Sequence, residues 1–308
     1  MVLHPFVDKM LAAGRAAGRP ALGAGTPDDA RTLLIASREA LGPGPAEVGM
    51  EALEVPTRAG TVPARCYRPA GPARGLVVYL HGGGWVCGAL EDYDALARFL
   101  AAESGCAVLV VDYRLAPEYP FPAGLEDSED ALLWVQQKGL QQLLGRSAPL
   151  IVSGDSAGGN LGIAAVNATR GRVEVALQVY FYPVTDCDMD RPSYQNYSKG
   201  MPLLASDMRW FFGHYAPQEL WSDPRIAVLR GDLSDTPRTW IATAEYDVLR
   251  DEGEEYAERL RATGAKVELH RIPGVPHGFV RMFNLVDTAR DAVQNATAAM
   301  ASACAKQA

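Results

Sequence analysis

The chain has 308 residues, of which 48% are hydrophobic and 21% are charged, so it is a globular protein with a large core and not a disordered chain. Its 29 Lys and Arg residues stand against 37 Asp and Glu residues, and this net charge of −8 argues against binding of a polyanion as the main task. The five cysteines are widely spaced and form no CxxC pair, which excludes a zinc ribbon or a thioredoxin motif, and no apolar stretch is long enough to span a membrane.

The predicted elements alternate between helices and buried strands along most of the chain. Residues 1–45 are expected to be helical and end in a Gly/Pro cluster, and residues 51–69 hold two short strands around a tight turn. From residue 75 onward, continuous apolar runs predict strands that are covered on both faces: Leu76–Leu80, Ala107–Val111, Leu150–Val152, Ala176–Phe181 and Thr239–Thr243. Helical segments between these runs predict an α/β fold with a mostly parallel, doubly wound sheet and helices on both faces.

One interval breaks this alternation. Residues 186–229 contain no clear central strand and are rich in aromatic residues, which indicates an inserted helical cap. Trp210, Phe211 and Phe212 are consecutive there, so they cannot all face a ligand from one side of a helix. The expected domains are an N-terminal helical cap segment, an α/β domain in two parts and the inserted cap segment: 1–45, 46–185 with 230–308, and 186–229.

The clearest motif is Gly154-Asp-Ser-Ala-Gly158, a G-x-S-x-G pattern between the strand at 150–153 and an apolar helix at 157–166. A serine at such a turn lies at a helix N-terminus, where free N–H groups and the helix dipole favour negative charge. Small residues two positions before and after it prevent collisions in the tight turn. The pattern alone is also compatible with an idle glycine-rich turn, but the strand–turn–helix context favours Ser156 as a nucleophile.

A second motif, His81-Gly-Gly-Gly84, directly follows the strand at 76–80. Its glycines allow bare backbone N–H groups to approach a ligand. A dinucleotide-binding loop is the alternative, but the third glycine of G-x-G-x-x-G would fall on Cys87, and no P-loop pattern occurs. The N–H groups of Gly83, Gly84 and Ala157 are therefore expected to form an oxyanion hole.

A serine nucleophile needs a base, and the base needs an acid that orients it. His277 lies just after a strand-like run in a loop stiffened by prolines, so it is the expected base, whereas His270 within that run is expected to be structural. Asp247 falls at the turn after the preceding strand and is the expected acid. Glu245 is the second choice for the acid, and Asp251 is expected to cap the next helix.

The order serine, aspartate, histidine is that of the α/β-hydrolases, and the chain resembles the bacterial hormone-sensitive-lipase-like carboxylesterases, also called family IV lipolytic enzymes. The matching motifs occur in the family's order over residues 45–285: His81-Gly-Gly-Gly-Trp85, Asp112-Tyr-Arg-Leu-Ala-Pro-Glu118, Pro120-Phe-Pro-Ala123, Gly154-Asp-Ser-Ala-Gly-Gly159, Asp247-Val-Leu-Arg-Asp-Glu-Gly253 and His277-Gly-Phe279. The resemblance implies an α/β-hydrolase fold with a helical cap. It also implies the triad and an oxyanion hole at the residues already singled out: Ser156, Asp247 and His277, with Gly83, Gly84 and Ala157.

Other residues of these motifs have expected roles as well. Asp155, beside the serine, is expected to be a hydrogen-bonding part of the scaffold. Trp85 follows the oxyanion glycines, and the sequence leaves open whether it packs in the core or lines the substrate pocket, for which Phe279 is a second candidate. Three polar residues are expected to form a network under the glycine loop: Tyr113, Arg114 and Glu118.

The expected activity is hydrolysis of short- to medium-chain carboxylic esters through an acyl-enzyme, without a metal or an organic cofactor. A lipase for longer chains and an amidase or deacetylase with the same triad stay open. A non-catalytic small-molecule receptor is the remote alternative, because plant gibberellin receptors resemble this family but lack its catalytic histidine. The expected partner is a small ester and neither nucleic acid nor a membrane, and a homodimer stays open. The N-terminus lacks a signal-peptide core, so a cytoplasmic location is expected.

Overall fold

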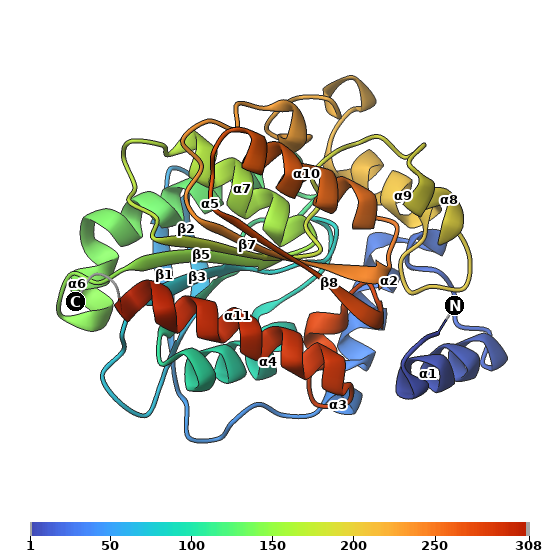
Figure 1. Cartoon of the computed structure of the whole chain (residues 1–308), viewed down its shortest axis with the longest axis horizontal. Helices are drawn as coiled ribbons and strands as arrows, with labels where there is room; N and C mark the ends of the chain where they lie inside the picture. Colours follow the sequence, from blue (N-terminus) through green and yellow to red (C-terminus); the bar gives the residue numbers. More distant parts are fainter. Residues whose placement is uncertain (1, 306–308) are drawn as a thin grey trace.

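A computed structural model describes residues 2–305 and shows one eight-stranded sheet with helices on both faces (Figure 1). The strand order is β1-β2-β4-β3-β5-β6-β7-β8. Strand β2 (Gly60–Arg68) is antiparallel to both of its neighbours, β1 (Gly49–Thr57) and β4 (Ala107–Val111), and all other neighbours pair in parallel. The prediction of a mostly parallel, doubly wound α/β sheet is confirmed.

The central strands are buried on both faces, as their continuous apolar runs predict. Every residue of β3, β4, β5 and β6 is buried. The remaining strands of the sheet are β3 (Leu76–Leu80), β5 (Leu150–Asp155), β6 (Leu177–Phe181), β7 (Thr239–Tyr246) and β8 (Val267–Pro276). Strands β7 and β8 extend several residues beyond their apolar cores, and this extension carries both strands to the loops that hold the predicted acid and base.

Two layers of helices cover the sheet (Figure 1). On one face lie α5 (Ala123–Trp134), α7 (Ala157–Ala168) and α10 (Arg250–Ala262), and on the other lie α4 (Leu90–Ser104) and α11 (Asp287–Ala305). Successive residues of β3 point to opposite faces, so Val78 joins the first core and Val77 the second. Helix α5 continues through a π-helical turn into a short helix: η2 (Val135–Gly139) and α6 (Leu140–Leu144).

The remaining helices come from residues 1–45 and 186–229. The N-terminal segment forms α1 (Pro5–Ala16), η1 (Leu22–Ala24), α2 (Pro27–Ala36) and α3 (Arg38–Leu41). The insertion forms α8 (Pro192–Asn196), α9 (Ala205–Tyr215), η3 (Gln218–Leu220) and η4 (Val228–Arg230). The two segments meet where the N–H of Gly23 donates to Asp207 Oδ1 at 2.8 Å. Helices α2, α8 and α9 therefore gather at the carboxyl ends of the parallel strands (Figure 1).

The start of helix α2 is fixed by its own side chains. Thr26 Oγ1 accepts the N–H of Asp29, and Asp29 Oδ2 accepts the N–H of Thr26 at 2.8 Å, which together form a capping box. Pro27 occupies the first helical position, where a missing N–H costs nothing. Within residues 2–305, no helix combines the length and the apolar character that crossing a bilayer requires.

Candidate active site

Ser156 lies at a strained turn between β5 and α7. Its backbone has φ 54° and ψ −121°, a conformation that is costly for a residue with a side chain. A Cβ atom at Gly158 would lie 2.0 Å from the carbonyl oxygen of Leu80, and one at Gly154 would lie 2.7 Å from the backbone of Gly158. A side chain at either position would collide with the backbone, so both motif positions require glycine. The N–H of Ser156 donates a hydrogen bond of 3.0 Å to the carbonyl of Phe181, which holds the turn in place.

The three residues of the predicted triad meet at the carboxyl ends of β5, β7 and β8. His277 Nε2 lies 3.0 Å from Ser156 Oγ, and His277 Nδ1 lies 2.7 Å from Asp247 Oδ2. Asp247 is buried, and its second oxygen, Oδ1, accepts the N–H of Leu249 at 3.0 Å. A carboxylate, an imidazole and a hydroxyl thus form one hydrogen-bonded row, although they are 30 and 121 residues apart along the chain.

The other acidic and histidine candidates have different partners. Glu245, the second choice for the acid, accepts the N–H of Gly274 at 2.8 Å and does not bond the imidazole. The prediction that Asp251 caps a helix is wrong, because α10 already begins at Arg250 and Asp251 accepts the N–H of Ser193 instead. His270 stacks on a buried tryptophan of β7 with 5.0 Å between ring centroids, which fits its expected structural role.

The glycine loop after β3 adopts conformations that favour glycine. Gly83 has φ 123° and Gly84 has φ 61°. A Cβ at Gly83 would lie 2.2 Å from the carbonyl oxygen of Cys87, and one at Gly84 would lie 2.2 Å from the ring of Phe211. In the described part of the chain, neither glycine N–H donates to a backbone or side-chain acceptor, and Ala157 N–H starts α7, where no intrahelical partner exists. Three donors are therefore available beside the serine.

A family model described as the alpha/beta hydrolase fold matches residues 77–281, which is more than half of the chain and includes every residue of this arrangement. The chain belongs to the α/β-hydrolase fold family. Among residues 2–305 of this α/β-hydrolase, no group of three or more His, Cys, Asp or Glu side chains has a geometry suited to holding a metal ion.

Similar proteins with named activities show which group within the α/β-hydrolases the chain belongs to. The carboxylic ester hydrolase LipN of Mycobacterium tuberculosis is 37% identical over 297 residues, which cover 92% of this chain and 78% of LipN. The ethyl acetate hydrolase of Pseudomonas putida is 40% identical over 249 residues, which cover 77% of each chain. The structure of a hyperthermophilic esterase from the archaeon Pyrobaculum calidifontis superposes with a TM-score of 0.91 at 36% identity and covers 98% of this chain and 99% of that chain. The predicted membership of the hormone-sensitive-lipase-like carboxylesterases is confirmed.

In this α/β-hydrolase, Asp155 joins the serine turn to the glycine loop. Its Oδ1 accepts the hydroxyl of Tyr79 and the N–H of Gly82, both at 2.9 Å, and its Oδ2 accepts the hydroxyl of Tyr93 at 3.1 Å. Burial raises the pKa of the Asp155 carboxyl, and the hydrogen bonds from Tyr79 and Gly82 oppose that rise. The contacts match the expected scaffold role, because they set the distance between Ser156 and the glycine N–H groups.

The expected polar network under the glycine loop is smaller than predicted. Tyr113 donates its hydroxyl to the carbonyl of His81 at 2.7 Å and so supports the loop directly. Arg114 instead pairs with a buried aspartate of α5 at 2.9 Å, and Glu118 pairs with Arg31 of α2 at 2.7 Å. The last two residues therefore hold surrounding segments in place rather than the loop itself.

The structure corrects the expectation for the substrate pocket. Trp85 is 1% exposed because its ring stacks on Tyr215 of α9 at 4.4 Å and contacts Phe212 at 5.1 Å. Phe279 is 0% exposed and packs edge-on against Phe181. A side chain that lines a cavity large enough for a substrate keeps surface that water can reach. Phe279 is thus a core residue and not a pocket wall, and Trp85 takes the first of its two expected roles, packing in the core.

Phe211 of α9 lies against the glycine loop, and the sequence did not distinguish it from its aromatic neighbours. Its ring covers the side of Gly84 where a Cβ would stand. Helix α9 is held there by tertiary contacts, among them the hydrogen bond from the N–H of Phe121 to the carbonyl of Tyr215 at 2.8 Å. No local sequence signal could have identified Phe211, because its place depends on how α9 docks.

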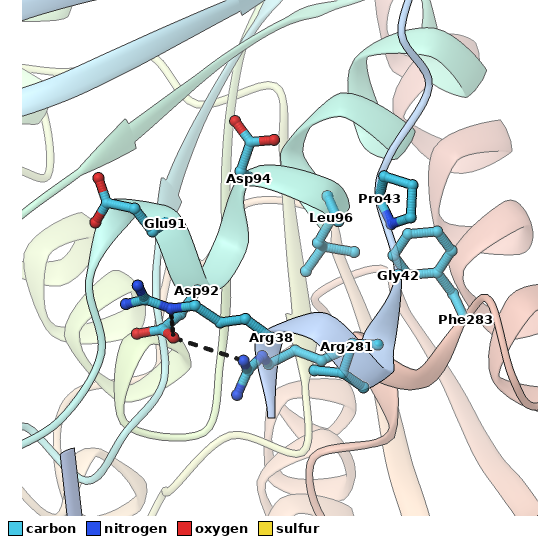
Figure 2. Close-up of a pocket in the computed structure, with 11 residues that line it drawn as sticks. Arg38, Gly42, Pro43, Glu91, Asp92, Asp94, Leu96, Arg281 and Phe283 are labelled. Carbon is cyan, nitrogen blue, oxygen red and sulfur yellow. Dashed lines mark hydrogen bonds and ion pairs between the residues drawn. The ribbon is translucent and has the colours of Figure 1, made fainter. Parts of the chain in front are cut away.

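A buried ion-pair junction joins the N-terminal helices to the segment after His277. Asp92 of α4, whose side chain is 2% exposed, lies 2.7 Å from Arg38 of α3 and 3.8 Å from Arg281 of η5 (Phe279–Met282). Figure 2 shows both guanidinium groups directed at this carboxylate beside a cavity of about 130 Å³. The Arg281 guanidinium also lies 5.4 Å from the centre of the Tyr93 ring, which bonds Asp155. The junction therefore links α3, α4 and the histidine loop.

Replacing Asp92 by alanine is expected to lower the free energy of unfolding by about 3 kcal/mol, because two arginines lose a buried partner. Urea denaturation measures the loss. Glu268→Ala is the matched control, since Glu268 pairs with Arg238 at the surface and its removal is expected to cost less than about 1 kcal/mol. Equal losses in the two variants would show that the junction contributes nothing beyond a surface pair.

A buried glutamate holds the start of the segment 186–229 against α10. Glu252 of α10 accepts the N–H groups of Thr185 and Asp186 at 2.8 and 3.2 Å, and the hydroxyl of Tyr194 of α8 lies 3.2 Å from its other oxygen. Burial raises the pKa of the Glu252 carboxyl to about 8, against the opposing effect of these backbone N–H groups and of the Arg191 charge. The carboxyl therefore keeps its proton in the folded protein over a range where the unfolded chain has lost it.

This raised pKa predicts a pH dependence of stability. Between pH values of about 5 and 8 the unfolded chain binds fewer protons at Glu252 than the folded protein, so stability falls as pH rises, by up to about 1.4 kcal/mol per pH unit. Glu252→Gln keeps an acceptor for the two N–H groups but does not titrate. Urea unfolding at pH 5, 6.5 and 8 should show that the free energy of unfolding of the variant rises relative to that of the wild type as pH rises. A difference that stays constant with pH would contradict the assignment.

Proposed function

We propose that this α/β-hydrolase, an ester hydrolase of its family, cleaves short- to medium-chain carboxylic esters through an acyl-enzyme on Ser156. Ser156 Oγ attacks the ester carbonyl, and His277 Nε2 takes its proton and passes it to the leaving alcohol. Asp247 orients the imidazole and stabilises its protonated form. The observation that carries the proposal is the row of hydrogen bonds of 3.0 and 2.7 Å through His277.

The oxyanion of the tetrahedral intermediate is assigned to the N–H groups of Gly83, Gly84 and Ala157. These donors are fixed before substrate arrives, so they stabilise the developing charge without reorganisation. Water then takes the place of the alcohol. His277 removes a proton from it, the resulting hydroxide attacks the acyl carbon, and the proton returns to Ser156 as the acid leaves.

Residues 1–45 and 186–229 together are proposed to form a cap over this site, with the α/β domain made of 46–185 and 230–308. Phe211 of α9, packed on the glycine loop, supports a small and closed acyl site. The name of the relative from Pseudomonas putida, ethyl acetate hydrolase, points to short esters as well. A cytoplasmic location is proposed with it, since all five cysteines are free thiols, as is usual in a reducing compartment.

A rate series over p-nitrophenyl esters from acetyl to palmitoyl tests the substrate class. We expect the highest kcat/KM for acyl chains of about two to eight carbons and a steep fall beyond about ten, because each buried methylene contributes about 0.8 kcal/mol only until the site is full. Efficient cleavage of the palmitoyl ester would instead identify a lipase. Faster turnover of the matching anilides than of the esters would identify an amidase.

A further inference from the structure

A second cavity, of about 710 Å³, lies at the opposite end of the sheet from Ser156. Its wall includes residues at the amino ends of β5 and β6 and at the C-terminal end of α11, which Figure 1 places far from α8 and α9. Three cationic side chains, Arg74, Lys138 and Arg146, line it together with a single carboxylate, Glu174. The cavity is therefore positively charged, in contrast to the net charge of −8 of the whole chain.

Two thiols meet beside this cavity. Cys304, in the last turn of α11, lines the cavity, and its Sγ lies 3.6 Å from Sγ of Cys106, which directly precedes β4. Both residues are buried. A Cβ at Gly75 would lie 2.6 Å from Cys304 Sγ and 3.7 Å from Cys106 Sγ, so the space for the two sulfurs exists because residue 75 is a glycine.

The environment of Cys106 differs from that of the other buried thiols. The hydrogen bond from the Cys304 thiol lowers the pKa of Cys106 against the effect of burial, and Ser104 and the N–H of Gly75 add to this lowering. Burial raises the pKa of Cys66 to about 11 and that of Cys87 to about 12. The same hydrogen bond and burial raise the pKa of Cys304, so Cys106 is the sulfur of the pair that more readily holds the thiolate, the reactive form of cysteine.

We propose that Cys106 and Cys304 are a reversible disulfide-forming pair, and that the cavity admits low-molecular-weight disulfides that carry negative charge. Cys106 Sγ, which accepts the hydrogen bond from the Cys304 thiol, is the thiolate of the pair and takes the proton of Cys304 as that sulfur reacts. Cys304 Sγ, on the residue that lines the cavity, attacks one sulfur of the small disulfide, whose S–S bond breaks and releases one thiol. Cys106 then attacks Sγ of Cys304 as a thiolate and releases the second thiol, so that the protein loses two electrons and two protons and the small disulfide gains them.

Bond formation needs a modest movement. The sulfurs must approach from 3.6 Å to about 2.05 Å, and Cys304 lies in the last turn of α11, one residue before its end. The new bond joins residues 198 positions apart and so removes conformational freedom from the unfolded chain. Oxidation is therefore expected to raise Tm by about 5 °C.

The test uses the whole protein and oxidised glutathione, which is anionic, with cystamine as a cationic disulfide of similar chemistry. After blocking of free thiols and digestion without reductant, mass spectrometry should find the Cys106 and Cys304 peptides joined, two hydrogens lighter than their sum, with two of five thiols lost. At low salt, oxidised glutathione should react about tenfold faster than cystamine, and salt or Arg146→Gln should reduce this ratio.

Two cysteine variants and a reagent that binds pairs of thiols complete the experiment. Cys304→Ser should abolish the linked peptide and the rise in Tm, whereas Cys187→Ser, which removes a thiol outside the pair, should leave both unchanged; p-nitrophenyl acetate turnover shows that each variant is folded. In the wild type, phenylarsine oxide, which bridges neighbouring thiols, should protect the pair from oxidation. Absence of the linked peptide in the wild type at every ratio of oxidised to reduced glutathione would overturn the pair. Equal rates with the two disulfides would overturn the assigned entry through the cavity.

Discussion

Replacing Ser156 by alanine is expected to reduce turnover of p-nitrophenyl esters by about 10⁴-fold or more, while the protein stays folded. The hydroxyl is the proposed attacking group, and among residues 2–305 its side-chain hydrogen-bond partner is His277 Nε2, so its removal eliminates the covalent route without disturbing the core. Steady-state kinetics at saturating ester measure the loss. Circular dichroism and thermal unfolding check that the fold is intact.

The companion variants decide whether the residues act as one unit. His277→Ala should be about as damaging as Ser156→Ala, and the double variant should be little worse than either single one, because each removal already breaks the same proton-transfer step. Ser128→Ala is the matched control, since the buried Ser128 hydroxyl donates to the carbonyl of Gly124 in its own helix. A fluorophosphonate probe should label the wild type and the control but not Ser156→Ala. Retention of a tenth of the wild-type rate by Ser156→Ala would refute the assignment.

Gly84→Ala is expected to lower kcat/KM by about 10²–10³-fold, the range observed when one oxyanion donor is lost. The new Cβ would lie 2.2 Å from the Phe211 ring at a backbone φ of 61°, so either the glycine loop or helix α9 must move. A shift of the loop withdraws the Gly83 and Gly84 N–H groups from the place where the oxyanion forms. Kinetics with p-nitrophenyl acetate measure the effect.

Two further variants separate this clash from the general cost of placing alanine in a left-handed backbone conformation. Gly145 has a similar φ of 69° with open space around it, so Gly145→Ala should cost about 1–2 kcal/mol of stability and leave kcat/KM unchanged. Adding Phe211→Ala to Gly84→Ala should restore part of the activity, because it removes the colliding ring. If the double variant were no better than Gly84→Ala, the contact with Phe211 would not be the cause of the loss.

The sequence by itself was enough to predict the sheet and the residues that form the candidate site. Continuous apolar runs predict β3, β4, β5 and β6 because a parallel strand covered on both faces must be apolar throughout, and this is a local property. The serine turn and the glycine loop could also be predicted from the sequence. A Cβ at position 84, 154 or 158 would collide with neighbouring atoms, so glycine is required there, close in sequence to the proposed catalytic groups. His277 and Asp247 followed from their places at strand ends, which meet at one edge of a parallel sheet.

Only the tertiary structure decided which side chains meet across long distances in the chain. Trp85 is a core residue because α9 brings Tyr215 against its ring, Phe211 covers Gly84 for the same reason, and Arg38, Asp92 and Arg281 come from three separate segments. The two thiols 198 positions apart are a further case. Hydrophobic periodicity records that a side chain is buried, but it does not record its neighbour. Those contacts depend on how helices dock, and docking is a property of whole surfaces that no short motif contains.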